Sequence, residues 1–511
     1  MDRSKLRWNG YGWTTHTDEL ANRDEVWTWL AAQLGMPALL ATPARDLNDI
    51  QLPAVKFSEA ELQAITQIVG AERLRSDASE RAFHTYARNY PGLVKSRAGE
   101  VGNAPDAIVY PRSGEEVTAL FTLASEREIA VRCWGGGSHG IDSPKLRAIA
   151  LDLSGLERVN EIQGDIATFD AGISGPALEK ALQAKGRTLG HRVEAFEFST
   201  LGGWIAQGDA GTGTLRYGAP RDWLTAVTVA TPQGLLVSSD AGLRNVIVGS
   251  RGLLGAITQA SVRTKALSRV RQTRTFLFPD FPSGQSAVRQ MLEDELPFSS
   301  LILSDGEDTR FWHALNALGK RRGLGARLAD TFRSKRGFDG RSVCLSLTLE
   351  GMSQNLDAAI AHAEKIAAKA GATALDSDEL TRKMPLGYFR DSLLDHGVGL
   401  ETFNFETDWA HLSALHASVA GALEKAFAEN APCPGAKGIP LAHAVALPCG
   451  KVQLALTYIF PRQLGNELPQ WENLQKAAQL AAGSKTDNSL EKEVLTALKK
   501  TVDPKGILGV D

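Results

Sequence analysis

Cysteine is scarce in this sequence, and long apolar runs are absent from it. The four cysteines, Cys133, Cys344, Cys433 and Cys449, are scattered through 511 residues and form no C-x-x-C pair. This pattern excludes a disulfide framework and favours reduced thiols, and we expect Cys133 to pack as a small apolar strand residue. No apolar run approaches the roughly 18 residues of a membrane span, so we expect no transmembrane segment.

The sequence also lacks an excess of either charge. Its 56 lysines and arginines against 59 aspartates and glutamates give a formal net charge of −3, which provides no electrostatic basis for binding nucleic acid. The start, MDRSKLRWNG, has no apolar signal segment, and the end, ILGVD, has no S-K-L address. We therefore expect a cytoplasmic globular protein.

Two glycine-rich segments stand out, RCWGGGSHG at 132–140 and EFSTLGGWIAQGDAGTGTLRYG at 197–218. The first follows a strand-like run, and its three glycines let backbone N–H groups come close to a diphosphate. The second adds the hydroxyls of Ser199 and Thr200 and two positions without side chains, Gly202 and Gly203. Donors on two separate loops can hold an extended dinucleotide at both ends, and we predict that it is FAD.

The first segment also satisfies the G-x-G-x-x-G pattern of a Rossmann fold, which is weak evidence by itself. A Rossmann loop opens a helix whose N-terminus faces the pyrophosphate. Here the loop leads through 141–144 into another strand-like run at 148–153. We therefore reject the Rossmann interpretation.

The order of motifs resembles the FAD domain of the vanillyl-alcohol oxidase superfamily, the PCMH-type flavoproteins. Within it, the chain is most similar to the alkyldihydroxyacetonephosphate synthases. The resemblance covers nearly the whole chain and is carried by these strings: LRWNGYGW at 6–13, PDAIVYP at 105–111, GGGSH at 135–139, AGISGPALE at 171–179, GH at 190–191, EFSTLGGW at 197–204, GSRGLLGAIT at 249–258, YFRD at 388–391, ETFNFETDW at 401–409 and VDPKGILG at 502–509.

The resemblance implies a set of residues that contact FAD, drawn from four segments. They are Cys133, Trp134, Gly135, Gly136, Gly137, Ser138, His139, His191, Glu194, Ala195, Phe198, Ser199, Thr200, Gly202, Gly203, Gln207, Gly208, Asp209, Ala210, Gly252, Gly255 and Ile257. In berberine-bridge relatives a flavin-bonded histidine follows the glycines directly, whereas Ser138 precedes His139 here. We therefore expect non-covalent FAD. His191 could contact the flavin phosphates or be a satisfied turn histidine.

The chain departs from the synthases on the substrate side. Their tyrosine on a late strand, counted from Gly450, falls on Leu454, and no histidine follows His443 where they carry a run of three. An arginine of the family is missing from the segment at 302–305, whereas Arg390 in YFRD matches the substrate-side arginine. These gaps argue against alkyl-glycerone-phosphate synthesis.

The candidate catalytic residues are therefore Arg390, for an anionic part of the substrate, and His443, as a general base at the start of the late strand. A buried structural role for His443 is the alternative. D-2-hydroxyacid dehydrogenases of the superfamily bind a divalent metal through histidines along this strand. The position seven beyond His443 is Gly450, so we expect no metal.

Capping boxes, Ser58 with Glu61 and Ser113 with Glu116, predict helix starts, and a first helix is expected at 19–34. Together with the resemblance, the element order predicts an α+β protein with a two-part PCMH-type FAD-binding domain and a mixed α/β substrate (cap) domain. The expected boundaries are 1–100 for an N-terminal helical wrap, 101–268 for the FAD domain, 269–482 for the cap, and 483–511 for a C-terminal helix returning to the FAD domain.

Basic residues crowd the segment 320–341. It could meet an anionic membrane surface or a phosphate-bearing substrate, or be a solvated loop, which we favour because it is also rich in glycine.

Three functions remain open. The first is an FAD-dependent oxidoreductase that takes a hydride from a C–H bearing a hydroxyl in a small polar or anionic substrate, and we favour it. The second is an alkyl-glycerone-phosphate synthase of ether-lipid synthesis. The third is a flavin-binding protein without turnover. We expect a small-molecule substrate as partner and a homodimer as a possible assembly.

Overall fold

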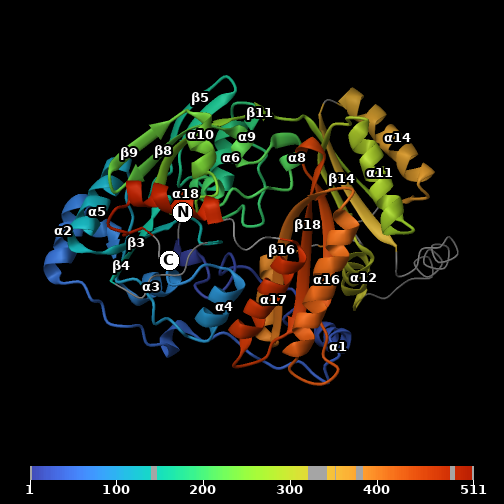
Figure 1. The fold of residues 1–511 in the computed structure, drawn as a ribbon, viewed down its shortest axis with the longest axis horizontal. Helices are drawn as coiled ribbons and strands as arrows, with labels where there is room; N and C mark the ends of the chain where they lie inside the picture. The colour runs from blue at the N-terminus through green and yellow to red at the C-terminus, as the bar shows by residue number, and fades with distance from the viewer. Residues whose placement is uncertain are drawn as a thin grey trace.

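The computed structural model describes residues 3–139, 147–319, 342–351, 353–375, 382, 384–483 and 489–508. The basic segment at 320–341 lies outside them, as do residues 140–146 after the glycine loop. In the described residues, two sheets form one half of the molecule and a seven-stranded sheet forms the other (Figure 1). A two-stranded pair, β7 (Arg187–Thr188) with β11 (Lys265–Ala266), is antiparallel.

The first half contains a partly parallel sheet and an antiparallel sheet. The first sheet has the order β1-β2-β4-β3, with β1 (Leu74–Arg75), β2 (Ala107–Val109), β3 (Ala130–Trp134) and β4 (Ala148–Asp152). The second has the order β5-β6-β10-β8-β9, with β5 (Val159–Gln163), β6 (Ile166–Asp170), β8 (Leu224–Thr231), β9 (Gly234–Ser238) and β10 (Ala256–Arg263). No helix is described between β3 and β4, the two strands that flank the glycine loop.

Helix α5 (Gly114–Arg127) joins the two sheets. Its residues Val117, Leu120, Phe121 and Ala124 are buried at the spacing of one helical face. They share an apolar cluster with both sheets, to which the second contributes Ala230 and Ala256. Shorter helices surround the second sheet: α6 (Gly175–Gln183), α7 (Leu201–Gln207), α8 (Thr214–Tyr217), α9 (Pro220–Trp223) and α10 (Ala241–Ile247), with η4 (Leu153–Gly155) after β4.

Short helices precede the sheets: η1 (Arg3–Lys5), α1 (Asp24–Gln33), η2 (Leu47–Asp49), α2 (Glu59–Val69), η3 (Ala71–Arg73), α3 (Ala78–Phe83) and α4 (Tyr90–Arg97). The predicted start of α1 at residue 19 is wrong, because Leu20 lies in a turn that its N–H closes onto Asp18. The capping box of Ser58 with Glu61 is confirmed.

The second predicted capping box is only half formed. Ser113 accepts the N–H of Glu116, but the Glu116 carboxylate accepts the N–H of Arg112 and the guanidinium of Arg73 instead of returning to Ser113. An arginine on another element therefore outcompetes the local bond.

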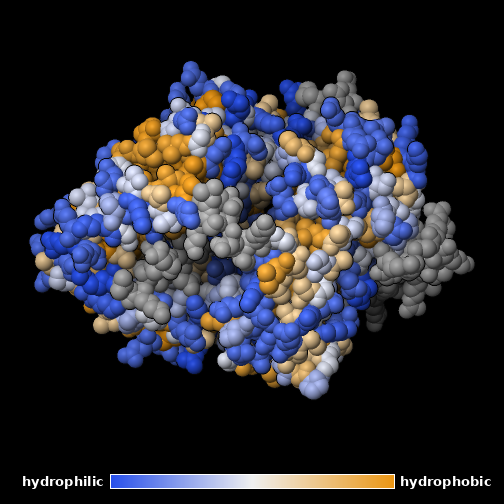
Figure 2. Space-filling model, viewed as in Figure 1, coloured by the Kyte–Doolittle hydropathy of each residue, from blue (hydrophilic) through white to orange (hydrophobic). Residues whose placement is uncertain are grey.

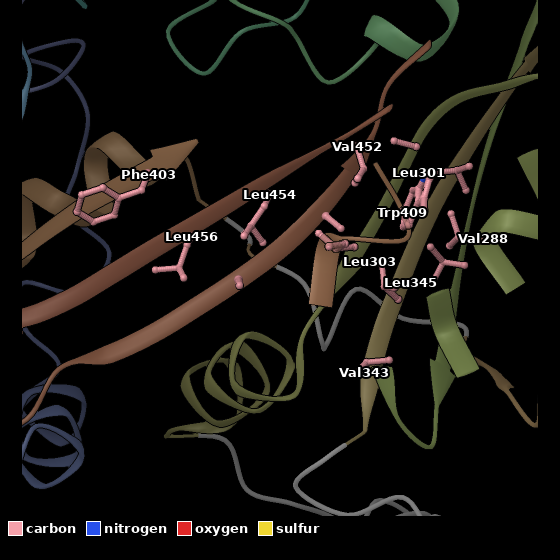
Figure 3. Packing of buried hydrophobic residues seen from close by; sticks show 14 of the residues in the cluster. Val288, Leu301, Leu303, Val343, Leu345, Phe403, Trp409, Val452, Leu454 and Leu456 are labelled. Carbon is pink, nitrogen blue, oxygen red and sulfur yellow. The ribbon is translucent and has the colours of Figure 1, made fainter. Parts of the chain in front are cut away.

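The seven-stranded antiparallel sheet has the order β15-β12-β14-β13-β17-β18-β16. Its strands are β12 (Val270–Phe278), β13 (Phe298–Ser304), β14 (Val343–Gly351), β15 (Thr373–Leu375), β16 (Val398–Asp408), β17 (Ile439–Ala446) and β18 (Lys451–Pro461). Four helices cover one face: α11 (Phe281–Glu293), α14 (Ser353–Lys369), α16 (Leu412–Glu429) and α17 (Glu467–Ala481). Figure 3 shows the apolar side chains of this face packed together. Further short helices are α12 (Gly306–Ala317), α15 (Leu386–Asp395) and η6 (Pro448–Gly450).

The end of the described chain returns to the first half. After α18 (Ser489–Val502), the Ile507 carbonyl accepts the N–H of Val131, and Leu508 bridges the same residue in parallel. Val494 and Leu495 on α18 are exposed. Figure 2 shows an apolar patch in the region of β8 and β9, to which β9 contributes the exposed Leu235 and Val237. None of the described helices combines the length and apolar character of a membrane span.

Candidate active site

A deep cavity lies between the two sheets of the first half. It offers about 1230 Å³ of space free of protein atoms, part of it open to solvent. Its walls come from β3 and the glycine loop, from 193–209, from 251–257 and from Ile507. Segments far apart in the sequence thus converge on one elongated site.

Most predicted cofactor residues line this cavity. The exceptions are His191, Phe198, Gly208 and Ala210. The cavity also has lining residues outside the predicted set: Ala130, Val131, Arg132, Leu153, Ala171, Val193, Trp204, Ala206, Arg251, Ala256 and Ile507. Seven of these, Arg132, Ala171, Trp204, Ala206, Arg251, Ala256 and Ile507, lie within the quoted sequence segments, so the sequence contained a signal for them.

The glycine loop presents unused donors. Among the described residues, none accepts a hydrogen bond from the backbone N–H of Gly136, Gly137 or Ser138, and both glycines are buried. Buried N–H groups are nearly always paired in native proteins. Three consecutive free ones on a cavity wall are what an anionic ligand such as a diphosphate requires.

At Gly136 the absence of a side chain is required by the contact between the two loops, not by the approach of a diphosphate. A Cβ there would overlap the Phe198 carbonyl and lie 2.6 Å from the Ser199 Cα. The glycine therefore permits the two loops to touch. Open space is found instead at Gly203, where a Cβ would meet only the Thr200 hydroxyl, at 3.2 Å, and at Gly252, where the nearest atom is the Cys133 Cβ, at 3.8 Å.

The second glycine-rich segment contributes hydroxyls rather than backbone donors. In the first turn of α7, Leu201 N–H bonds Ile173, Gly202 N–H bonds Ala171 and Gly203 N–H bonds the Thr200 hydroxyl. The Ser199 hydroxyl accepts the Trp204 indole N–H at 2.7 Å. Because both hydroxyls act as acceptors inside the protein, each keeps its own hydrogen for a ligand.

Positive charge is buried beneath the glycine loop. Arg3, Arg88 and Arg132 are 5–6% exposed, and the one fully buried carboxylate among them is Asp152. Arg3 donates to both Asp152 oxygens and to the Gly135 carbonyl. Burial alone would raise the pKa of Asp152, but the charge and hydrogen bonds of Arg3 outweigh it and hold that pKa far below its usual range. A further buried cation, Arg88, has no acidic side chain at ion-pair distance among the described residues, which fits a ligand with negative charge. FAD, with its diphosphate, matches this wall.

His191 is neither at the cavity nor satisfied. Its ring lies between Trp204 and Trp223, with centroids 5.1 and 5.5 Å away, and neither ring nitrogen has a hydrogen-bond partner. Burial lowers the pKa of His191 to about 4, so it is a neutral member of an apolar cluster. The expectation of a satisfied turn histidine is wrong.

Arg390 on α15 reaches the glycine loop through one intermediate residue. Its Nη2 donates to the Arg88 carbonyl at 2.6 Å, and the Arg88 N–H donates to the Gly137 carbonyl at 2.9 Å. Its Nε is buried without a partner. Within the described chain, no carboxylate pairs with Arg390, because Asp391 accepts from Arg7 and from Tyr11 N–H.

His443 lies in the middle of β17 rather than at its start, directly opposite Ser304 on β13. Burial, aided by the charge of Arg382, lowers the pKa of His443 to about 4, while Asp305 and Glu194 act in the opposite direction. Glu194 lines the cavity, and its carboxylate accepts from Arg382 at 3.0 Å. His443 is therefore a neutral imidazole within electrostatic range of the cavity wall.

Leu454 does not lie at the site. It is 1% exposed and packs with Phe403, Leu456 and Val452 on the helix-covered face (Figure 3). Side chains alternate between the faces of a strand, so the neighbours on the opposite face are Gln453 and Ala455. Leu454 thus lies on the helix-covered face, and neither of its neighbours on the opposite face is a tyrosine.

The cysteine beside the loop is not a nucleophile. Cys133 is half-buried on β3, and burial raises the pKa of its thiol to about 12. Within the described ranges, no three His, Cys, Asp or Glu side chains gather in a way that could hold a metal ion.

Comparison with known proteins gives matches on both halves. Residues 105–240 match the family described as "FAD binding domain", and residues 267–454 match "FAD linked oxidases, C-terminal domain". An alkyldihydroxyacetonephosphate synthase of Dictyostelium discoideum is 30% identical over 73% of this chain, a stretch that spans 65% of that protein. One from Caenorhabditis elegans is 24% identical over 93% of this chain and 86% of its own length.

More distant relatives and solved structures agree. Glycolate oxidase subunit GlcD of Bacillus subtilis is 23% identical over 48% of this chain and 53% of its own length. A solved alkyldihydroxyacetonephosphate synthase superimposes with a TM-score of 0.85 at 26% identity, covering 99% of both chains. A p-cresol methylhydroxylase shares the fold, with a TM-score of 0.62 at 11% identity over 89% of this chain and 97% of that one. The chain thus belongs to the FAD-linked oxidase family, whose members are enzymes, and its cofactor is FAD.

Proposed function

We propose that this protein is an FAD-dependent oxidoreductase that oxidises a C–H bearing a hydroxyl in a small polar or anionic substrate. The observation that carries the proposal is the position of Arg390 beside the glycine loop, with a buried Nε that has no partner. A guanidinium with unused donors next to the cofactor cavity suits a carboxylate or phosphate.

The residues of the chain have separate tasks in this reaction. Arg390 binds and orients the anionic group, and His443, which is neutral, accepts the proton that leaves the substrate hydroxyl. Glu194 joins the cofactor wall to the start of α15, because its carboxylate accepts from Arg382 and from the Leu386 N–H. FAD supplies the acceptor for the hydride, which leaves the same carbon as the C=O bond forms.

The face of the seven-stranded sheet away from its helices supports a small polar substrate. Around His443 this face carries Gln453, Ala455 and Thr457, and the same two strands also place the apolar Ile439, Leu441, Val445 and Ile459 on it. The first half of the molecule packs toward this face, since the Tyr217 hydroxyl on α8 bonds Glu350.

Alkyl-glycerone-phosphate synthesis is the second candidate, because the solved synthase superimposes over 99% of both chains. The absence of a tyrosine at either pocket-side position, 453 or 455, argues against it. We also propose that FAD is held without a covalent bond, so acid precipitation should release it into the supernatant. Flavin retained in the pellet would contradict this and implicate His139.

The test is anaerobic bleaching of the oxidised flavin by hydroxy acids, alcohols and phosphorylated ketones, followed by product identification. A hydroxy acid or alcohol should bleach the flavin and yield the carbonyl product, whereas formation of alkyl-glycerone phosphate would support the synthase. His443→Asn should slow reduction by roughly 10²–10⁴-fold. His191→Asn is the control, because burial lowers the pKa of His191 to about 4 as well, but its ring lies between Trp204 and Trp223.

A further inference from the structure

Arg88 is a buried cation without a carboxylate partner. It is 5% exposed, and within the described residues no acidic side chain lies at ion-pair distance from it. Its guanidinium donates to three backbone carbonyls, those of Phe83 and Tyr86 through Nη1 and that of Arg7 through Nη2, at 2.9–3.0 Å. It also stacks 4.1 Å above the Phe83 ring. Burial and the charges of Arg3 and Arg132 lower the pKa of Arg88 to about 9, so it stays charged at neutral pH.

The backbone of Arg88 links two parts of the site. Its N–H donates to Gly137, in the loop with the free donors, and its carbonyl accepts from Arg390, on the substrate side. Any shift of residue 88 therefore moves the glycine loop and Arg390 together.

The side chain of Arg88 fixes that backbone against the N-terminal strap, which we define as residues 3–16. The strap holds α15 in turn: Tyr11 N–H donates to Asp391 at 2.7 Å, Trp13 N–H donates to the Tyr388 hydroxyl at 3.1 Å, and His16 stacks on Tyr388 at 3.6 Å. The Tyr11 hydroxyl donates to the Glu194 carbonyl at the cavity. The strap therefore makes hydrogen bonds both to the cofactor wall and to α15.

We propose that Arg88 is a positioning residue of the active site, whose hydrogen bonds to the carbonyls of Phe83, Tyr86 and, on the strap, Arg7 set the glycine loop for FAD and Arg390 for the substrate. The glycine-loop part is independent of the proposed reaction, and the part concerning Arg390 as an anion ligand rests on the proposed function. Arginine is required because its planar fork reaches carbonyls in several directions, whereas a lysine is a single point of charge.

The experiment compares Arg88→Met and Arg88→Lys with Arg81→Met in the full-length protein. Arg81 is the matched control: it is also 5% exposed and donates to two backbone carbonyls, those of Pro105 and Pro53, but it does not contact the loop, the strap or α15. Thermal unfolding measures the structural cost of each change. FAD affinity is read from flavin fluorescence and absorbance on titration of apoprotein, and hydrogen exchange is followed in peptides covering 134–139 and 386–395.

Both Arg88 variants should weaken FAD binding by about 10- to 100-fold, the loss expected for hydrogen bonds to a charged group. Both should speed exchange in the loop and in α15 together, by roughly tenfold. Arg81→Met should lower the melting temperature without either change. The inference is overturned if Arg88→Lys binds FAD within twofold of the native protein, or if exchange in 386–395 is unaffected. Because no substrate enters these measurements, they stand whether or not the proposed oxidation is found.

Discussion

Alanine at Gly136 and alanine at Gly203 should change the stability of the apoprotein in opposite directions. At Gly136 the new methyl group would overlap the Phe198 carbonyl and sit 2.6 Å from the Ser199 Cα. Both neighbours are backbone atoms, which cannot rotate away as a side chain can. Overpacking of this kind costs about 1 to 3 kcal/mol, so the free energy of unfolding should fall by that amount.

Gly203 lies in the first turn of α7, and a methyl group there meets only the Thr200 hydroxyl, at 3.2 Å. Alanine in a helix is favoured over glycine by roughly 0.5 to 1 kcal/mol, so the apoprotein should become slightly more stable. The methyl group projects into the space of the cavity that Gly203 lines. FAD affinity should therefore fall although the fold is strengthened.

Urea unfolding gives the free energy of unfolding of each variant apoprotein, and titration with FAD gives its affinity for the cofactor. Both variants should bind FAD more weakly, Gly136→Ala because its loops separate and Gly203→Ala because its methyl group takes ligand space. Native FAD affinity in Gly203→Ala would refute the assignment of this wall to the cofactor. An apoprotein of Gly136→Ala as stable as the native one would show that the contact with Phe198 is not needed.

Three further predictions concern titration. The pKa of His443 is lowered to about 4, so the imidazole is already deprotonated at pH 6. The rate of flavin reduction, measured by stopped-flow absorbance, should therefore show no rise between pH 6 and 8 from this group. A rise in that rate through pH 6.5 would contradict the burial of His443. His191 has a folded pKa of about 4 against 6.5, so the unfolded chain takes the proton first. The free energy of unfolding should therefore fall by about 3 kcal/mol as pH drops from 6.5 to 4, and His191→Asn should flatten this part of the curve in urea unfolding. Burial, helped by Asp305, raises the pKa of Asp308 from 3.8 to about 7, so the folded state loses stability as pH rises and this carboxyl must ionise. Asp308→Asn should therefore raise the free energy of unfolding by roughly 4 kcal/mol at pH 8 but hardly at pH 4. An equal gain at both pH values would rule out titration as the cause.

The cofactor site could be predicted because its contacts lie in short contiguous strings. The loop at 135–139 and the segment at 197–209 are each positioned by local turns, so their spacing in the sequence carries the geometry. The buried cations beneath them could not be found in the same way. Arg3 reaches Asp152 across 149 residues and Arg88 reaches Arg390 across 302, and no spacing rule connects such positions before the sheets bring them together.

Leu454 shows the limit of counting along a strand. The reference glycine, Gly450, directly precedes β18 and lies in a tight turn in which Cys449 and Gly450 both have positive φ, 57° and 71°. One residue more or less in such a turn moves every following side chain to the other face of the sheet. The buried face of a helix could be predicted where apolar residues recur along its whole length, as in α5. The side of the sheet on which a single strand residue lies could not, because it depends on the geometry of the preceding turn.

The position of Leu454 in the core decides which side chains of β18 face the first half of the molecule. With Leu454 in the core, the β18 positions available to the site are Gln453 and Ala455, and an amide or a methyl group cannot transfer protons at neutral pH. On the neighbouring strand β17, His443 is the titratable side chain that occupies the same face. An exchange of a fatty acid for a fatty alcohol needs proton transfers at two steps, whereas oxidation of a hydroxyl needs one acceptor. His443 as that acceptor and Arg390 as the ligand of an anionic group are sufficient for the second reaction.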